Sequence, residues 1–125
     1  MHARQRPVHV KTEPARRGGA NGAAAEIKET WLLKPQADVE HPEISVVIPA
    51  LDEQLTISQF VRWCQEGMAQ AGVSGEIVIV DSSTDMTAQR ALQAGARVLR
   101  TPRRGLGRAY KDAIPYARGR YVLMG

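Results

Sequence analysis

The sequence contains one cysteine, Cys64, among 125 residues, and it has few aromatic side chains and no long apolar run. A single cysteine excludes an internal disulfide framework and is typical of a protein from a reducing compartment. Because no stretch of about 18 apolar residues occurs, the sequence offers no candidate transmembrane helix. The three histidines are scattered and Cys64 has no Cys or His partner at a ligand spacing, so we expect no structural zinc site.

The N-terminal segment lacks both a targeting signal and the pattern of a folded unit. No apolar region of about 7–15 residues follows the basic start, which excludes a secretory signal peptide. Residues 1–25 show no apolar periodicity, and such a composition does not bury enough surface to offset the entropy of ordering. We therefore expect residues 1–43 to form a flexible tail and linker and residues 44–125 to form the domain. Within the tail, an apolar patch of Ile27, Trp31, Leu32 and Leu33 is expected to dock on the domain.

Charge is distributed unevenly, although the net charge is only +4. Residues 1–43 carry a charge of +1, residues 44–89 carry −5 and residues 90–125 carry +8. An acidic segment followed by a basic one indicates an anionic partner. A nucleic acid is the least favoured partner, because stacking of bases needs exposed aromatic side chains and two of the three tyrosines in the basic segment occupy helix-core or strand positions.

From Ile44 onward, short apolar runs alternate with helical patterns. The runs at residues 44–48, 76–80, 97–99 and 121–124 are typical of strands that are buried on both faces of a parallel sheet. The patterns between them predict helices that end at Gly72, at Gly95 and near Pro115. This alternation predicts an α/β fold with an open, mainly parallel, Rossmann-like sheet. In chain order, the four strands should lie in the spatial order 3-2-1-4.

Polar residues follow three of these strands at the point where each ends. In open α/β sheets, ligands bind at the carboxyl ends of the strands. Asp52 and Glu53 follow the first strand and residues 81–85 the second, and ionised carboxylates accept hydrogen bonds from sugar hydroxyls and base N–H groups. Residues 103–107 combine arginines and glycines at a helix start, which suits a phosphate. Each cluster alone is better explained as a loop acceptor, a helix cap or a solvated surface, but together they favour a nucleotide or a nucleotide sugar.

Four segments in this order resemble the start of family 2 glycosyltransferases of the GT-A fold. They are residues 46–53, 77–87, 102–107 and 118–125. The resemblance covers about residues 44–125 and is greatest to dolichyl- and polyprenyl-phosphate hexose synthases. It implies a truncated GT-A nucleotide-binding half, in a protein that transfers a hexose from UDP- or GDP-hexose to a polyprenyl or dolichyl phosphate or another small acceptor.

The resemblance also implies which residues hold the donor. Ten residues would form the nucleotide-sugar site: Pro49, Leu51, Asp52, Glu53, Ile79, Asp81, Asp85, Arg104, Gly105 and Gly107. The loop of residues 81–85 is one residue shorter than the family's D-x-G-S-x-D loop, so the role of Asp85 departs from the pattern. The family's D-x-D motif, which holds Mg or Mn on the donor diphosphate, would follow Gly125. We therefore expect no catalytic residue and no metal ligand within this chain.

Two functions remain open on this basis. The first is a glycosyltransferase, of which these 125 residues alone would be inactive. The alternative is a catalytically inactive nucleotide-binding module, because the metal and acceptor sites would be missing. For either, we expect a cytoplasmic protein, and a lipid-phosphate acceptor would place it peripherally at the membrane surface.

Overall fold

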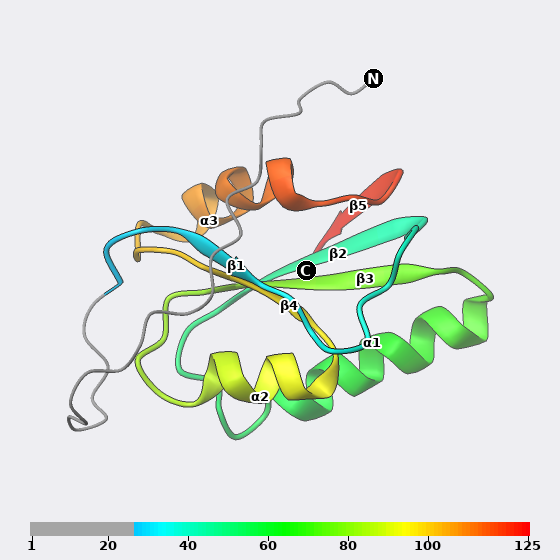
Figure 1. Ribbon diagram of the computed structural model, residues 1–125, viewed down its shortest axis with the longest axis horizontal. Helices are drawn as coiled ribbons and strands as arrows, with labels where there is room; N and C mark the ends of the chain where they lie inside the picture. The colour runs from blue at the N-terminus through cyan, green and yellow to red at the C-terminus, as the bar shows by residue number, and fades with distance from the viewer. Residues whose placement is uncertain (1–26) are drawn as a thin grey trace.

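A computed structural model describes residues 27–125 as three layers, with helices on both faces of one sheet (Figure 1). The prediction that residues 1–25 are mobile lies outside the described residues. The elements are β1 (Trp31–Leu33), β2 (Ile44–Ala50), α1 (Ile57–Ala71), β3 (Gly75–Asp81), α2 (Thr87–Ala94), β4 (Arg97–Arg100), α3 (Leu106–Ala113), the 3-10 helix η1 (Ile114–Tyr116) and β5 (Tyr121–Met124).

The sheet has five strands in the order β1-β4-β3-β2-β5. Strand β2 pairs in parallel with β3 and with β5, and β3 pairs in parallel with β4. The predicted α/β class is confirmed, and the four predicted strands lie in the predicted order. Alternation of strand and helix produces this order because each crossover helix returns the chain to the same end of the sheet.

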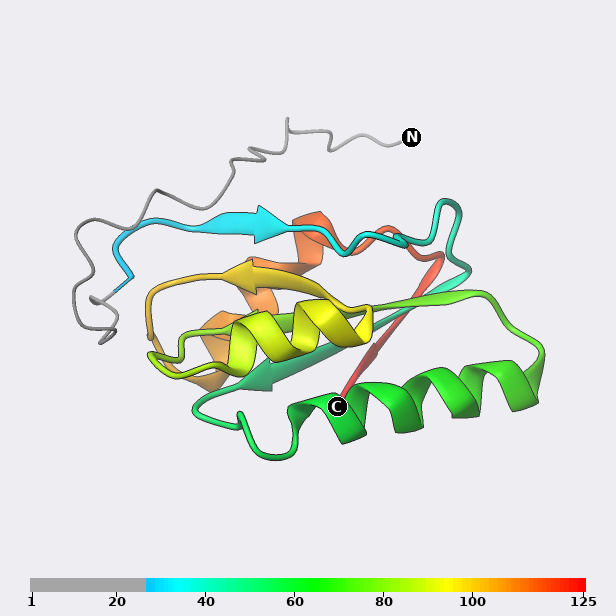
Figure 2. The ribbon, with the colours of Figure 1, turned by 60° about the horizontal axis from the view of Figure 1, so that its bottom comes forward.

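The sheet differs from the prediction at one edge, where β1 pairs antiparallel with β4 (Figure 2). Residues 31–33 belong to the segment that we expected to be tail and linker. They join the sheet because Leu32 is then buried, with 2% of its surface exposed, in the core between the sheet and α3. The expected docking of the apolar patch thus takes the form of a strand, and β4 is no longer an edge strand.

Alternate residues of the strands pack on opposite faces of the sheet, as a period of two requires. On β3, Ile77 and Ile79 pack in the core that also contains residues of α1 and α2. Val78 and Val80 pack in the second core, on the side of α3. Figure 1 shows α1 and α2 on one side of the sheet and α3 on the other. This alternation decides which side chains meet at the ends of the strands.

Strand β2 continues through Pro49, where we expected it to stop. Val47 O accepts a hydrogen bond from Gly125 N, so every second residue of β2 turns its backbone polar groups toward β5. The pairing with β5 reaches only Val47, and Pro49 lies beyond it on the same side. A proline lacks an N–H, but no ladder hydrogen bond is lost at a position where no partner strand is present.

The predicted helix ends are confirmed. Gly72 and Gly95 follow α1 and α2 with φ angles of 69° and 109°, the left-handed conformation that glycine adopts without strain. Helix α3 gives way to a 3-10 turn ahead of Pro115. None of the helices within residues 27–125 combines the length and apolar character needed to cross a membrane.

Candidate functional site

Three loops meet at the carboxyl edge of the sheet, after β2, β3 and β4. The first two are joined by hydrogen bonds: Asp52 N donates to Ser83 Oγ at 2.6 Å, and Glu53 N donates to Thr87 Oγ1 at 2.8 Å. Asp52 has a φ of 53°, and its Oδ1 accepts from Thr84 N at 3.4 Å. These bonds hold the turn after β2 against the loop after β3, so the two loops are fixed relative to each other at this edge of the sheet.

A pocket of about 350 Å³ opens at this edge, on the side of the sheet that α3 covers. Five of the ten predicted site residues line it: Pro49, Leu51, Glu53, Arg104 and Gly105. The rest of its wall comes from the ends of β2 and β3, the loops after β3 and β4, and the first turns of α3. These residues are Ala50, Val80, Ser82, Thr101, Pro102, Arg103, Leu106 and Ala109. The structure therefore brings the carboxylate of the first loop and the arginines of the third to one cavity.

The basic loop leads into α3. Gly105 adopts a φ of 96° immediately before the helix, a conformation that favours glycine. Arg103 and Arg104 are exposed, and Arg104 Nη1 lies 3.6 Å from Asp112 Oδ2. Arg108 Nε lies 3.0 Å from Asp112 Oδ1 on the next turn. A helix N-terminus beside two guanidinium groups favours an anion electrostatically.

Asp81 faces the interior. It is fully buried, and its Oδ2 lies 3.1 Å from Arg100 Nε in an ion pair. Its Oδ1 accepts from Ser83 N at 3.2 Å, and Arg100 Nη2 donates to Ser83 O at 2.8 Å. Burial raises the pKa of Asp81, and the contacts with Ser83 and Arg100 offset part of that rise. Asp81 thus holds the backbone of the loop after β3 from beneath.

The other predicted residues lie around the pocket but do not line it. Asp85 Oδ1 accepts from Thr87 N at 2.9 Å, which caps the start of α2. Burial raises the pKa of Asp85, but the hydrogen bonds from Thr87 outweigh it and leave this pKa below its ordinary value. Ile79 is fully buried in the core beside α1 and α2. Gly107 lies on α3, where an added Cβ would meet no atom within 4 Å.

Sequence reasoning missed Arg100, Thr101 and the inward direction of Asp81. The period of two was the available signal, because Ile77, Ile79 and Asp81 must share a face, while the pocket is on the other. An arginine at each end of a four-residue strand was a second signal. Buried arginines need acidic partners, and Asp81 ends the adjacent strand.

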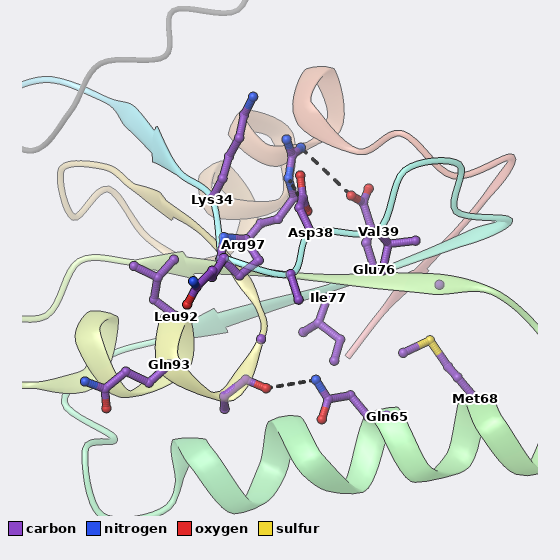
Figure 3. Close-up of a pocket in the computed structure, with 16 residues that line it drawn as sticks. Lys34, Asp38, Val39, Gln65, Met68, Glu76, Ile77, Leu92, Gln93 and Arg97 are labelled. Carbon is purple, nitrogen blue, oxygen red and sulfur yellow. Dashed lines mark hydrogen bonds and ion pairs between the residues drawn. The ribbon is translucent and has the colours of Figure 1, made fainter.

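A larger cavity, of about 640 Å³, lies near the opposite, amino end of β3 and β4 (Figure 3). Arg97 lies there between Asp38 and Glu76, with nitrogen–oxygen distances of 3.3 Å and 3.9 Å. Arg118 pairs with the same two carboxylates, at 3.3 Å and 2.8 Å. Since these four charges neutralise one another, they tie the segment after β1 to the sheet.

Within residues 27–125, no three His, Cys, Asp or Glu side chains come together in a way that could hold a metal ion. The described residues at the pocket therefore offer no ligand set of that kind for the divalent metal that the resemblance to family 2 glycosyltransferases implies. The chemistry that this part of the chain offers is hydrogen bonding from loops and attraction by arginines.

Comparison with known proteins agrees with this geometry. The family model described as Glycosyl transferase family 2 matches residues 45–124. The low-salt glycan biosynthesis hexosyltransferase Agl6 of Haloferax volcanii is 34% identical over 119 residues, which cover 95% of this chain and 29% of that relative. The chain therefore spans less than a third of the relative's length. No solved structure matches the chain.

Proposed function

Because the chain belongs to glycosyl transferase family 2, we propose that it forms the nucleotide-binding part of a hexosyltransferase. The donor is a UDP- or GDP-hexose, and the acceptor is a polyprenyl phosphate, a dolichyl phosphate or another small molecule. One observation carries the proposal: a single pocket at the carboxyl edge joins Glu53 to Arg104. A nucleotide sugar presents hydroxyl and N–H donors at one end and phosphates in the middle, which matches this pair of charges.

The pocket residues suggest how the donor lies. Glu53 accepts hydrogen bonds from ribose or base, beside the apolar walls of Pro49 and Leu51. Arg104 and the N-terminus of α3 at Gly105 face the diphosphate. When the hexose is transferred, negative charge grows on the departing diphosphate, and fixed positive groups stabilise that charge in the transition state.

The five predicted residues outside the pocket wall keep indirect roles in this proposal. Asp52 and Asp85 fix the first two loops through their hydrogen bonds, and Asp81 holds the second loop through Ser83 and Arg100. Ile79 packs beneath Asp81, and Gly107 leaves space near the phosphate end. With a lipid-phosphate acceptor, the enzyme works at the cytoplasmic surface of a membrane.

Calorimetric titration of the chain with UDP, GDP and the bare nucleosides tests the proposal. Replacing Arg104 by Ala should weaken a diphosphate about tenfold and leave the nucleoside unchanged, because charge-assisted contacts to phosphate are lost. Added salt should reduce that difference, since exposed ion pairs are screened. The matched control is Arg62→Ala on α1, an exposed arginine away from the pocket. Equal losses for nucleoside and diphosphate would show that Arg104 is only a surface charge.

Turnover separates the two open functions when it is measured with a longer protein that contains these residues, because we expect these 125 residues alone to be inactive. Release of UDP or GDP from a nucleotide hexose in the presence of a polyprenyl phosphate would support the transferase. Binding without release would favour the alternative, a nucleotide-binding module. Absence of binding to both diphosphates would contradict both.

A further inference from the structure

Strand β1 lies outside the region that matches the family, yet it contacts both sides of the candidate site. Trp31 is in register with Arg100, which in turn is in register with Asp81. These three residues form a row across adjacent strands, on the face that α1 and α2 cover. The guanidinium carbon of Arg100 lies 5.8 Å from the centre of the Trp31 ring, a cation–π contact.

Arg100 transmits this contact to the loop after β3. Only 6% of the Arg100 surface is exposed, so the direction of its guanidinium group is set by its neighbours. It pairs with Asp81 at 3.1 Å and donates to Ser83 O at 2.8 Å. The adjacent Ser82 lines the pocket. The ring of Trp31 therefore supports the arginine that fixes one wall of the nucleotide site.

A second set of contacts runs from Thr30, the residue before β1, to the basic loop on the other face of the sheet. Thr30 Oγ1 and Thr101 Oγ1 lie 3.0 Å apart, and Thr101 Oγ1 donates to Asp112 Oδ2 at 3.4 Å. Because the single hydroxyl proton of Thr101 is given to Asp112, Thr30 is the donor to Thr101. Asp112 in turn pairs with Arg104 at 3.6 Å. This path ends at the arginine that we assign to the phosphates.

From these two paths we propose that β1 and the preceding Thr30 form a positioning element for the donor, with Trp31 acting on the nucleoside end and Thr30 on the diphosphate end. The inference rests on the proposed function, since it concerns the same pocket. A three-residue edge strand with one partner strand opens more readily than the centre of a sheet. Docking of β1 thus adjusts donor affinity from outside the region that the family model matches.

The test compares Trp31→Leu, Trp31→Phe and Thr30→Val in titrations with uridine, guanosine, UDP and GDP. Leu keeps an apolar side chain but has no aromatic face, and Trp31→Leu should weaken nucleoside and diphosphate alike, by about fivefold. Phe keeps the face and should restore affinity to within about twofold. Thr30→Val keeps the shape without the hydroxyl, and should weaken only the diphosphates, by about threefold.

Trp63→Leu is the matched control, because Trp63 is an exposed tryptophan on α1. Thermal unfolding of every variant identifies any loss of folded protein. If wild type binds and Arg104→Ala is selective, but Trp31→Leu and Thr30→Val bind like wild type, the inference is overturned and the proposed function stands. Equal weakening of all ligands by both β1 variants and by Trp31→Phe would overturn it too, since that shows a general loss of structure. If wild type binds no diphosphate, both fail together.

Discussion

The ion pair of Asp81 and Arg100 is the most deeply buried charged contact at the carboxyl edge of the sheet. Asp81→Asn keeps the size of the side chain but leaves the guanidinium group of Arg100 without its counter-charge. Removing one partner of a buried pair destabilises a protein by about 3–5 kcal/mol. We expect the free energy of unfolding, measured by urea titration, to fall by about 3–5 kcal/mol.

Glu66→Gln provides the comparison for this measurement, because Glu66 is exposed on α1. Neutralising an exposed carboxylate should change stability by less than about 0.5 kcal/mol. Similar losses in the two variants would show that Asp81 and Arg100 are not specially dependent on one another.

Asp85 gives the fold a defined response to acid. Its hydrogen bonds with Thr87 lower its pKa in the folded state, so the ionised form is favoured by folding. The stabilisation is therefore complete above the unfolded pKa, at about 4, and is lost as the pH falls through the lower folded value. Asp85→Ala should cost about 1 kcal/mol at neutral pH, and its difference from wild type should shrink in acid.

The serine variant separates charge from hydrogen bonding at this cap. Asp85→Ser keeps an acceptor for the backbone of α2 but does not titrate. Urea unfolding near pH 7 and pH 3 should show most of the stability retained and none of the acid dependence due to Asp85. An unchanged acid dependence in both variants would mean that the cap is not its source.

Strand β5 depends on the tight approach of Gly119 to β2. A Cβ at this glycine would lie 2.5 Å from Ile44 C and 2.6 Å from Ser45 N, and Gly119 N donates to Ser45 Oγ at 2.7 Å. Gly119→Ala should therefore push the start of β5 away from β2, at a cost of about 2 kcal/mol in unfolding free energy. Faster hydrogen exchange of the β5 amides would locate the damage.

Gly107→Ala is the matched control for Gly119→Ala. An added Cβ there meets no atom within 4 Å, and alanine favours the helical conformation of α3. We expect stability to stay the same or to rise by up to about 1 kcal/mol. If Gly119→Ala were equally harmless, the close contact between β5 and β2 would not limit their pairing.

Four of the five strands were predictable because each is a short apolar run between helical patterns that end at glycine or proline. Strand β1 was not, since three apolar residues carry no period and their place depends on pairing with β4, far along the chain. Only five of the ten predicted site residues line the pocket, because the sequence pattern again determines only part of their placement. The end of a strand predicts the edge of the sheet at which a residue lies. The face that its side chain occupies depends on whether its position along the strand is odd or even, and this places Ile79 and Asp81 on the face away from the pocket.

The arginines of the basic C-terminal segment occupy two different places in the folded domain. Arg97, Arg100 and Arg118 pair with carboxylates of the linker and of β3, and so serve the sheet. Arg103 and Arg104 remain exposed beside the pocket at the carboxyl edge. The charge of +8 over residues 90–125 therefore overstates the field available to an anion, because part of it is neutralised within the fold. Of the remainder, Arg103 and Arg104 line the pocket where the donor phosphates are proposed to bind.

Among the described residues, the sheet ends in the short strand β1 on one side and in β5 on the other. Strand β5 ends the strand order, and all four of its side chains are exposed, between 38% and 56% of their surface. An edge of unpaired backbone groups flanked by apolar side chains favours pairing with another strand.

We expect the chain to associate reversibly as its concentration rises, measured by sedimentation equilibrium. Leu123→Lys should suppress this association, because a charged edge disfavours pairing. Leu55→Lys, in an exposed loop, should not. A wild-type chain that stays monomeric at every concentration would show that the edge does not pair.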